Sequence, residues 1–141
     1  MPYFLSLLAR AHARNRQTGA ALETLAEARE RAEQTGERIW EAELHRLEGV
    51  LALEAASAPP PPGAVERAEK CLAQARAVAQ RQGARSLELR AAMSLARLRR
   101  LQGDAGAAGR ELREVYQTFT EGFDTADLKQ ARALLATLAA R

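Results

Sequence analysis

Arginines are the residues of this sequence whose type and spacing could do chemistry. Their guanidinium groups offer a planar fork of N–H donors that matches a carboxylate or a phosphate in a bidentate way. Six arginines fall within three stretches of helical periodicity: Arg10, Arg14, Arg46, Arg90, Arg97 and Arg100. The chemistry that they indicate is recognition of an anion.

Other kinds of site find little support. His12 and His45 are the only histidines, and neither has a second ligand at a metal-like spacing. The single cysteine, Cys71, allows no internal disulfide and is predicted to be a small buried hydrophobe. The segment 103–106 lacks the spacing and the Lys-Ser/Thr of a phosphate loop, and it is predicted to be a turn. We therefore expect no catalytic residue, metal site or cofactor in this chain, and any catalysis would reside in domains outside it.

The composition favours an all-α protein. Of the 141 residues 47% are hydrophobic and only 4% aromatic, because Ala and Leu dominate together with other good helix formers. The net charge of +3 permits an acidic partner but is far from the dense basic surface of a dedicated nucleic-acid binder. The sequence shows neither a signal peptide nor an apolar stretch of membrane-spanning length, so we expect a soluble, cytoplasmic protein.

A short pattern recurs three times along the chain. It reads Ala-x3-Leu-x2-Ala/Val and covers 21–28, 68–75 and 108–115. Each copy follows a small residue, and these are Ala9, Gly49 and Ala96. The interval is 12 residues in the first and third copies and 19 in the second, where four prolines intervene. Self-similarity at a period of tens of residues predicts a stacked repeat protein.

The elements follow from this repeat. We expect one domain over 1–141, made of three helical hairpins at about 3–36, 38–83 and 86–119 and a capping helix at 125–140. A proline-rich insertion at 57–63 is expected inside the second hairpin. Gly83 is predicted to end a helix, Ser86 to cap the next, and Asp124 or Thr125 to cap the last. Ala136 would mark a fourth, unfinished repeat, because it lies 40 residues after Ala96.

These features resemble the tetratricopeptide repeat. Leu8-Ala9 and Leu95-Ala96 match its first helix. Ala21, Ala68 and Ala108, which follow 12 residues later if the insertion is set aside and have a leucine four residues further on, match its second. The 40-residue unit and the stretches 37–49, 81–92 and 122–129 are similar to the helical tails of bacterial cyclase–ATPase and transcriptional-activator proteins. The resemblance implies a right-handed α-solenoid of about three and a half repeats that takes part in signalling.

In such a stack the first helix of each hairpin would line an inner wall. With the three small residues as phase markers, Glu43 and Val50 would lie on this wall beside a predicted partner-binding set: Tyr3, Arg10, Arg14, Arg46, Arg90, Met93, Arg97 and Arg100. One interpretation is a basic groove for an acidic segment of a partner or of a parent chain. The other is that the arginines keep an Ala-rich helix soluble and pair with glutamates one turn away.

The function expected first is a protein–protein interaction or scaffolding module, within the C-terminal regulatory part of a larger bacterial signalling protein. Nucleic-acid binding through the arginines is one alternative, although so few aromatic residues offer little base stacking. A structural self-association module is another, since Phe4 and Leu7 would leave an apolar face on the first hairpin.

Overall fold

The computed structural model describes residues 23–27, 30–31, 34, 41–55 and 61–139. Helices joined by turns and loops make up these ranges, and they contain no strand, which confirms the expected all-α class. The helices are α3 (Glu41–Ala55), α4 (Pro62–Gln82), α5 (Arg85–Leu101), α6 (Ala105–Tyr116) and α7 (Ala126–Ala139). None of the helices in the described ranges has both the length and the apolar character needed to cross a membrane.

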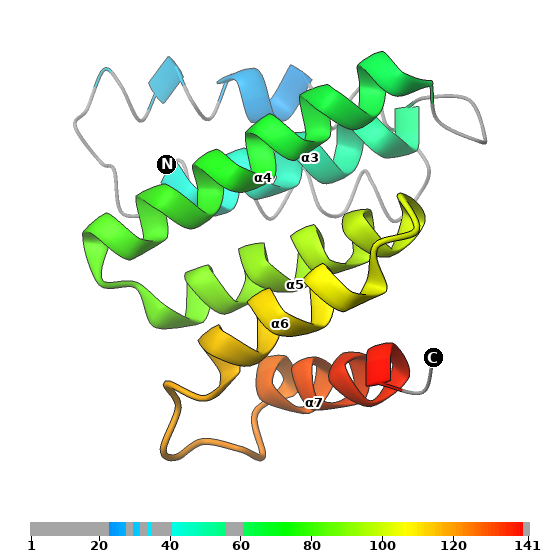
Figure 1. Ribbon diagram of the computed structural model, residues 1–141. Helices are drawn as coiled ribbons and strands as arrows, with labels where there is room; N and C mark the ends of the chain where they lie inside the picture. The colour runs from blue at the N-terminus through cyan, green and yellow to red at the C-terminus, as the bar shows by residue number, and fades with distance from the viewer. Residues whose placement is uncertain (1–22, 28–29, 32–33, 35–40, 56–60, 140–141) are drawn as a thin grey trace.

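Each helix packs on the one that follows it in the chain, and α5 also packs on α3 and α7 (Figure 1). The helices α3, α5 and α7 therefore form one row, while α4 and α6 bridge successive members of it. The central member of the row is α5, which contacts all four of the others.

Alanines and leucines fill the space between the helices. The leucines of the recurring pattern, Leu25, Leu72 and Leu112, are each at most 1% exposed. The largest cluster joins α5, α6 and α7, and a second cluster packs α4 on α5 with Val50 and Leu53 of α3 beside it.

Two of the small residues that marked the repeat, Gly49 and Ala96, sit where helices come close, and Ala9 lies outside the described residues. A Cβ atom placed on Gly49 would lie 3.1 Å from the carbonyl oxygen of Ala68 and 3.1 Å from Leu72 Cγ, so a side chain there would crowd α4. Ala96 and Ala108 are buried in one cluster between α5 and α6. Ala136 is exposed, and because α7 is the last helix described, no following helix tests its predicted phase.

The end of the predicted proline-rich insertion belongs to a helix. The insertion was expected over 57–63, but α4 begins at Pro62, with Pro61 as its extended N-cap residue. A proline fits the first helical position because its fixed φ suits the helix and its missing N–H is not needed there. The assignment of Pro62 and Gly63 to the insertion is therefore wrong, and residues 56–60 lie outside the described part.

The predicted caps are partly confirmed. Gly83 ends α4 in the left-handed region, at φ 67°, as expected. Ser86 is not a cap, because α5 already begins at Arg85 and its N-cap residue is Ala84, which makes no side-chain cap. Thr125 rather than Asp124 caps α7, since its Oγ1 accepts a hydrogen bond from the Leu128 N–H at 3.4 Å.

The helix α6 ends three residues earlier than the 119 expected. The Thr118 hydroxyl donates to the Val115 carbonyl at 2.7 Å, and such a local hydrogen bond competes with continuation of a helix. A loop over 117–125 follows, and Gly122 adopts φ 75° within it.

Candidate functional site

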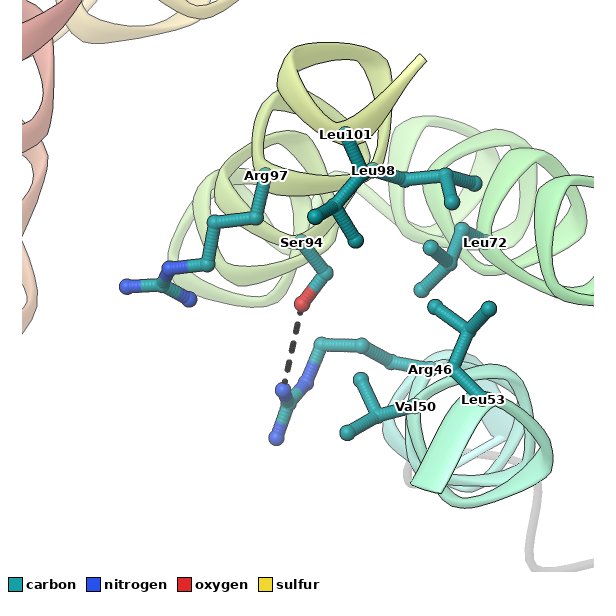
Figure 2. Close-up of a pocket in the computed structure, with 8 residues that line it drawn as sticks. All are labelled: Arg46, Val50, Leu53, Leu72, Ser94, Arg97, Leu98 and Leu101. Carbon is teal, nitrogen blue, oxygen red and sulfur yellow. Dashed lines mark hydrogen bonds between the residues drawn. The ribbon is translucent and has the colours of Figure 1, made fainter. Parts of the chain in front are cut away.

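A cavity of about 240 Å³ lies between α3 and α5 (Figure 2). It is lined by three residues of α3, one of α4 and four of α5: Arg46, Val50, Leu53, Leu72, Ser94, Arg97, Leu98 and Leu101. Sites for drug-sized molecules usually measure roughly 300–1,000 Å³. This α3–α5 cavity is therefore better matched to a side chain of another protein than to a cofactor.

The walls of the α3–α5 cavity are apolar. Leu72 and Leu98 are 1% exposed and belong to the core, whereas Val50 and Leu53 are half-buried. Leu101 is 70% exposed and lines the same cavity. An apolar group that entered the cavity would leave water, which stabilises a complex by roughly 25 cal/mol per Å² of apolar surface.

The guanidinium groups of two arginines lie on the same side of this cavity (Figure 2). The first, Arg46, is already bound. Its Nε donates to Glu43 Oε1 at 2.6 Å, its Nη2 donates to Glu43 Oε2 at 3.2 Å, and its Nη1 donates to Ser94 Oγ at 3.3 Å. Arg46 therefore has its charge compensated from inside the fold.

The second guanidinium group, that of Arg97, makes no hydrogen bond or ion pair with any residue that the structure describes. Its side chain is exposed and points away from the cavity walls (Figure 2). Loss of solvent around the guanidinium and repulsion from Arg46 both lower the pKa of Arg97. Arginine stays protonated at physiological pH, so Arg97 is a cation that a bound anion would stabilise.

Glu43 is the most important residue whose structural role the sequence analysis missed. It is 3% exposed and receives, besides Arg46, a hydrogen bond from Arg90 Nη1 at 3.0 Å. Arg90 Nε in turn donates to Asp127 Oδ2 at 2.9 Å, so the chain of contacts crosses from α3 through α5 to α7. The spacing of three residues between Glu43 and Arg46 is the signal that could have indicated the first of these pairs.

Burial by itself would raise the pKa of the Glu43 carboxyl. The hydrogen bonds and positive charges of Arg46 and Arg90 act in the opposite direction and leave the pKa below the usual 4.5. For Arg90, burial lowers the pKa, but the bonds to Asp127 and Glu43 raise it overall. Glu43 is thus a carboxylate at neutral pH, and it holds two of the predicted arginines in structural pairs.

The predicted partner-binding set is therefore divided. Tyr3, Arg10 and Arg14 lie outside the described residues. Arg46 and Arg97 meet at the α3–α5 cavity, whereas Arg90 joins α3 to α7. Arg100 is half-buried, does not line this cavity, and makes no hydrogen bond or ion pair with a described residue.

Met93 does not line an open surface, and its assignment to the partner-binding face is wrong. It is 2% exposed and packs with Leu89 and Ala96 in the cluster between α5, α6 and α7. These residues lie four and three positions from Met93, which places all of them on one face of the helix. The apolar face of α5 is thus broader than the small-residue markers indicated.

A second cavity, of about 380 Å³, lies beside the loop that joins α6 to α7. Arg90 and Asp127 are among its lining residues, but these two side chains are paired with each other. Its charged walls are thus partly satisfied by internal contacts.

Metal-binding and nucleophilic groups are sparse. Within the described ranges, no three His, Cys, Asp or Glu side chains come together as a group that could hold a metal ion. His45 Nε2 lies 3.8 Å from Glu41 Oε1, one helical turn away. Cys71 is half-buried rather than fully buried as predicted, and it lies at the close approach of α4 to Gly49.

The chain was compared with protein families, with curated proteins and with solved structures, and none of these comparisons finds a match.

Proposed function

We propose that this chain is a protein-interaction module that docks a segment of a partner protein in the α3–α5 cavity. The observation that carries the proposal is the combination of an apolar cavity with an unpaired cation, Arg97, beside it. The docked segment would place one apolar side chain inside the cavity and a neighbouring carboxylate on Arg97. An arginine fork suits a carboxylate, and an apolar anchor in a small pocket is typical of protein recognition.

We also propose that the row of α3, α5 and α7 is the inner wall of a right-handed, tetratricopeptide-like solenoid of about three and a half repeats. The packing of consecutive helices and the close approaches at Gly49 and between Ala96 and Ala108 support this arrangement. In a solenoid each repeat contacts its neighbours, and the inner wall offers an extended surface for partners. A regulatory role inside a larger signalling protein is consistent with such a surface.

Nucleic-acid binding receives less support than the sequence suggested. Arg46 and Arg90 are held by Glu43, and Arg99 is held by Glu69 and Glu111. These pairs reduce the number of cations that could contact phosphates. A salt titration separates the two functions, because phosphate binding weakens steeply with salt and apolar docking does not.

Selection of ligands from a random-peptide library tests the proposed function. Selected peptides should bind with an affinity that Leu101→Glu lowers by roughly tenfold, which corresponds to about 1.4 kcal/mol. Leu101 is suited to this test because it is 70% exposed and its replacement leaves the core intact. Ala133→Glu is the matched control, since Ala133 is exposed on α7 away from the cavity. Equal loss in both variants, or no selected peptide at all, would rule out docking in the α3–α5 cavity.

A further inference from the structure

The loop between α6 and α7 presents an aromatic side chain flanked by acids. Phe123 is 43% exposed, and its ring rests against that of Tyr116 with centroids 5.9 Å apart. Glu121 and Asp124 are both exposed, and neither side chain bonds to another residue in the described part of the chain. The loop thus combines an apolar group with two negative charges within four residues.

The α3–α5 cavity carries the complementary features. Phe123 and Leu101 are the exposed large hydrophobic residues of the described part of the chain, and Leu101 lines this cavity. Arg97 is an unpaired positive charge, and Glu121 and Asp124 are negative charges that lack a partner. Single exposed apolar residues are common on protein surfaces. Here, however, Leu101 lies beside a positive charge and Phe123 lies beside negative charges.

We propose that a second copy of this chain is a partner of the α3–α5 cavity, with its Phe123 inserted between α3 and α5 and its Asp124 or Glu121 on Arg97. This inference rests on the proposed function and names the occupant of that site. The contact joins two different surfaces, so it is head-to-tail and can continue from copy to copy.

The loop does not reach the cavity of its own chain. Arg85 Nη1 donates to the Thr118 carbonyl at 3.1 Å, which fixes the start of the loop at the first residue of α5. The cavity lies at the other end of α5, between Ser94 and Leu101. With a rise of 1.5 Å per residue, the two ends of this 17-residue helix are about 24 Å apart. An intermolecular contact therefore fits the positions of the two surfaces.

Two complementary variants of the full chain provide the test. A loop variant, Phe123→Ala with Asp124→Lys, keeps the cavity but removes the inserted group. A cavity variant, Arg97→Glu with Leu101→Glu, keeps the loop but repels it. All four side chains are exposed, so the core is left unchanged, and circular dichroism checks that both variants remain helical.

The measurement is mean mass by sedimentation velocity, at concentrations up to about 1 mM because so small a contact is expected to be weak. The original chain should grow beyond a dimer with concentration, whereas each variant alone should stay monomeric. An equimolar mixture of the variants should form a dimer and stop there, since only one compatible pair of surfaces remains. Arg97→Glu alone should weaken association by at least about tenfold, because it places like charges together.

Three results would overturn this inference: a monomeric original chain over the whole range, variants that assemble as the original chain does, or a mixture that stays monomeric. If the inference fails while library peptides still bind and Leu101→Glu weakens them, self-docking is wrong and the proposed function stands. If neither peptides nor a second copy occupies the cavity, both are wrong.

Discussion

The buried carboxylate of Glu43 organises the charged residues of the row formed by α3, α5 and α7. Burying an ion costs several kcal/mol unless hydrogen bonds replace its water. Glu43 receives three such bonds, two from Arg46 and one from Arg90. Both arginines remain partly exposed, so only one member of the group is fully removed from water. The arrangement ties the position of α3 to that of α5 without leaving a buried charge uncompensated.

Glu43 should make stability depend on acid pH. The carboxyl has a folded pKa below the usual 4.5, because the arginines outweigh the effect of burial. A group with a lowered folded pKa stabilises the protein above its unfolded pKa and loses this contribution as pH falls through its folded pKa. We therefore expect Glu43→Gln to lower the free energy of unfolding by about 2 kcal/mol at pH 7. The difference between the two proteins should shrink below about pH 4.5.

Urea denaturation at pH 7 and at several values down to about pH 3 measures this difference. Glu114→Gln is the control, because Glu114 is exposed on α6 and should change stability little at any pH. A Glu43→Gln penalty that stays constant from neutral to acid pH would contradict the assignment of the effect to this carboxylate.

Which arginines are free depends in part on contacts between residues far apart in the sequence. The periodicity, with Gly49 and Ala96 as markers of one helix face, correctly predicted that Arg46 and Arg97 lie on one surface, because both line the α3–α5 cavity. The pair of Arg46 with Glu43, three residues away, is local and could have separated Arg46 from Arg97, whereas the bond of Arg46 to Ser94 spans 48 residues. Arg90 reaches Glu43 across 47 residues and Asp127 across 37. Long-range pairs of this kind become visible only when the helices are stacked.

Among the elements, α5 holds its neighbours through two arginines on opposite faces. Arg90 contacts Glu43 of α3 and Asp127 of α7. Arg99 contacts Glu69 of α4 at 3.1 Å and Glu111 of α6 at 2.9 Å. The two arginines are nine residues apart, which is about two and a half helical turns and points them in opposite directions. The helix α5 thereby bonds to the other members of its row, α3 and α7, and to the two bridging helices, α4 and α6.

The packing of α3 on α4 should depend on the missing side chain of Gly49. Even a Cβ there would come within 3.1 Å of the Ala68 carbonyl oxygen, which is backbone and cannot rotate away. Gly49→Val should therefore lower the free energy of unfolding by about 1–3 kcal/mol, despite the better helix propensity of a non-glycine residue. Thermal and urea denaturation measure the change.

Gly106→Ala is the matched control for this prediction. A Cβ on Gly106 would meet only the end of the Arg110 side chain, at 3.5 Å, so α6 can accept it. This substitution should stabilise the chain by about 0.5–1 kcal/mol, because alanine favours a helix over glycine. If Gly49→Val stabilised to the same extent, close approach of α3 and α4 would not be what requires glycine.

At the scale of the helices, the sequence predicted which segments are helical better than it predicted the residues at which the helices begin and end. The predicted third hairpin at 86–119 and the capping helix at 125–140 correspond to α5 with α6 and to α7, with bounds that differ by one to three residues. Apolar periodicity extends over many residues, so it survives local errors. Helix ends depend on single contacts, such as the Thr118 hydroxyl bond that accompanies the early end of α6.

For the molecule as a whole, stability should be highest at its centre. Among the described helices, α5 is the only one that contacts four others, whereas α7 contacts α5 and α6. A helix is stabilised by the helices it packs against, so a helix with few of them opens more easily. The core cluster to which α7 contributes also contains Leu89 and Met93 of α5. Opening of α7 would therefore expose these two side chains of α5.

Hydrogen exchange can measure this difference between α5 and α7. We expect the amides of α5 between Leu89 and Leu98 to exchange at least about tenfold more slowly than those of α7, because local opening frees α7 without unfolding α5. The comparison uses peptides from the same digest, with α6 as an internal reference between the two. Deuterium uptake at several times after dilution, followed by mass spectrometry, gives the rates. Equal protection of α5, α6 and α7 would instead mean that these helices unfold as one cooperative unit, and faster exchange in α5 would contradict its central role.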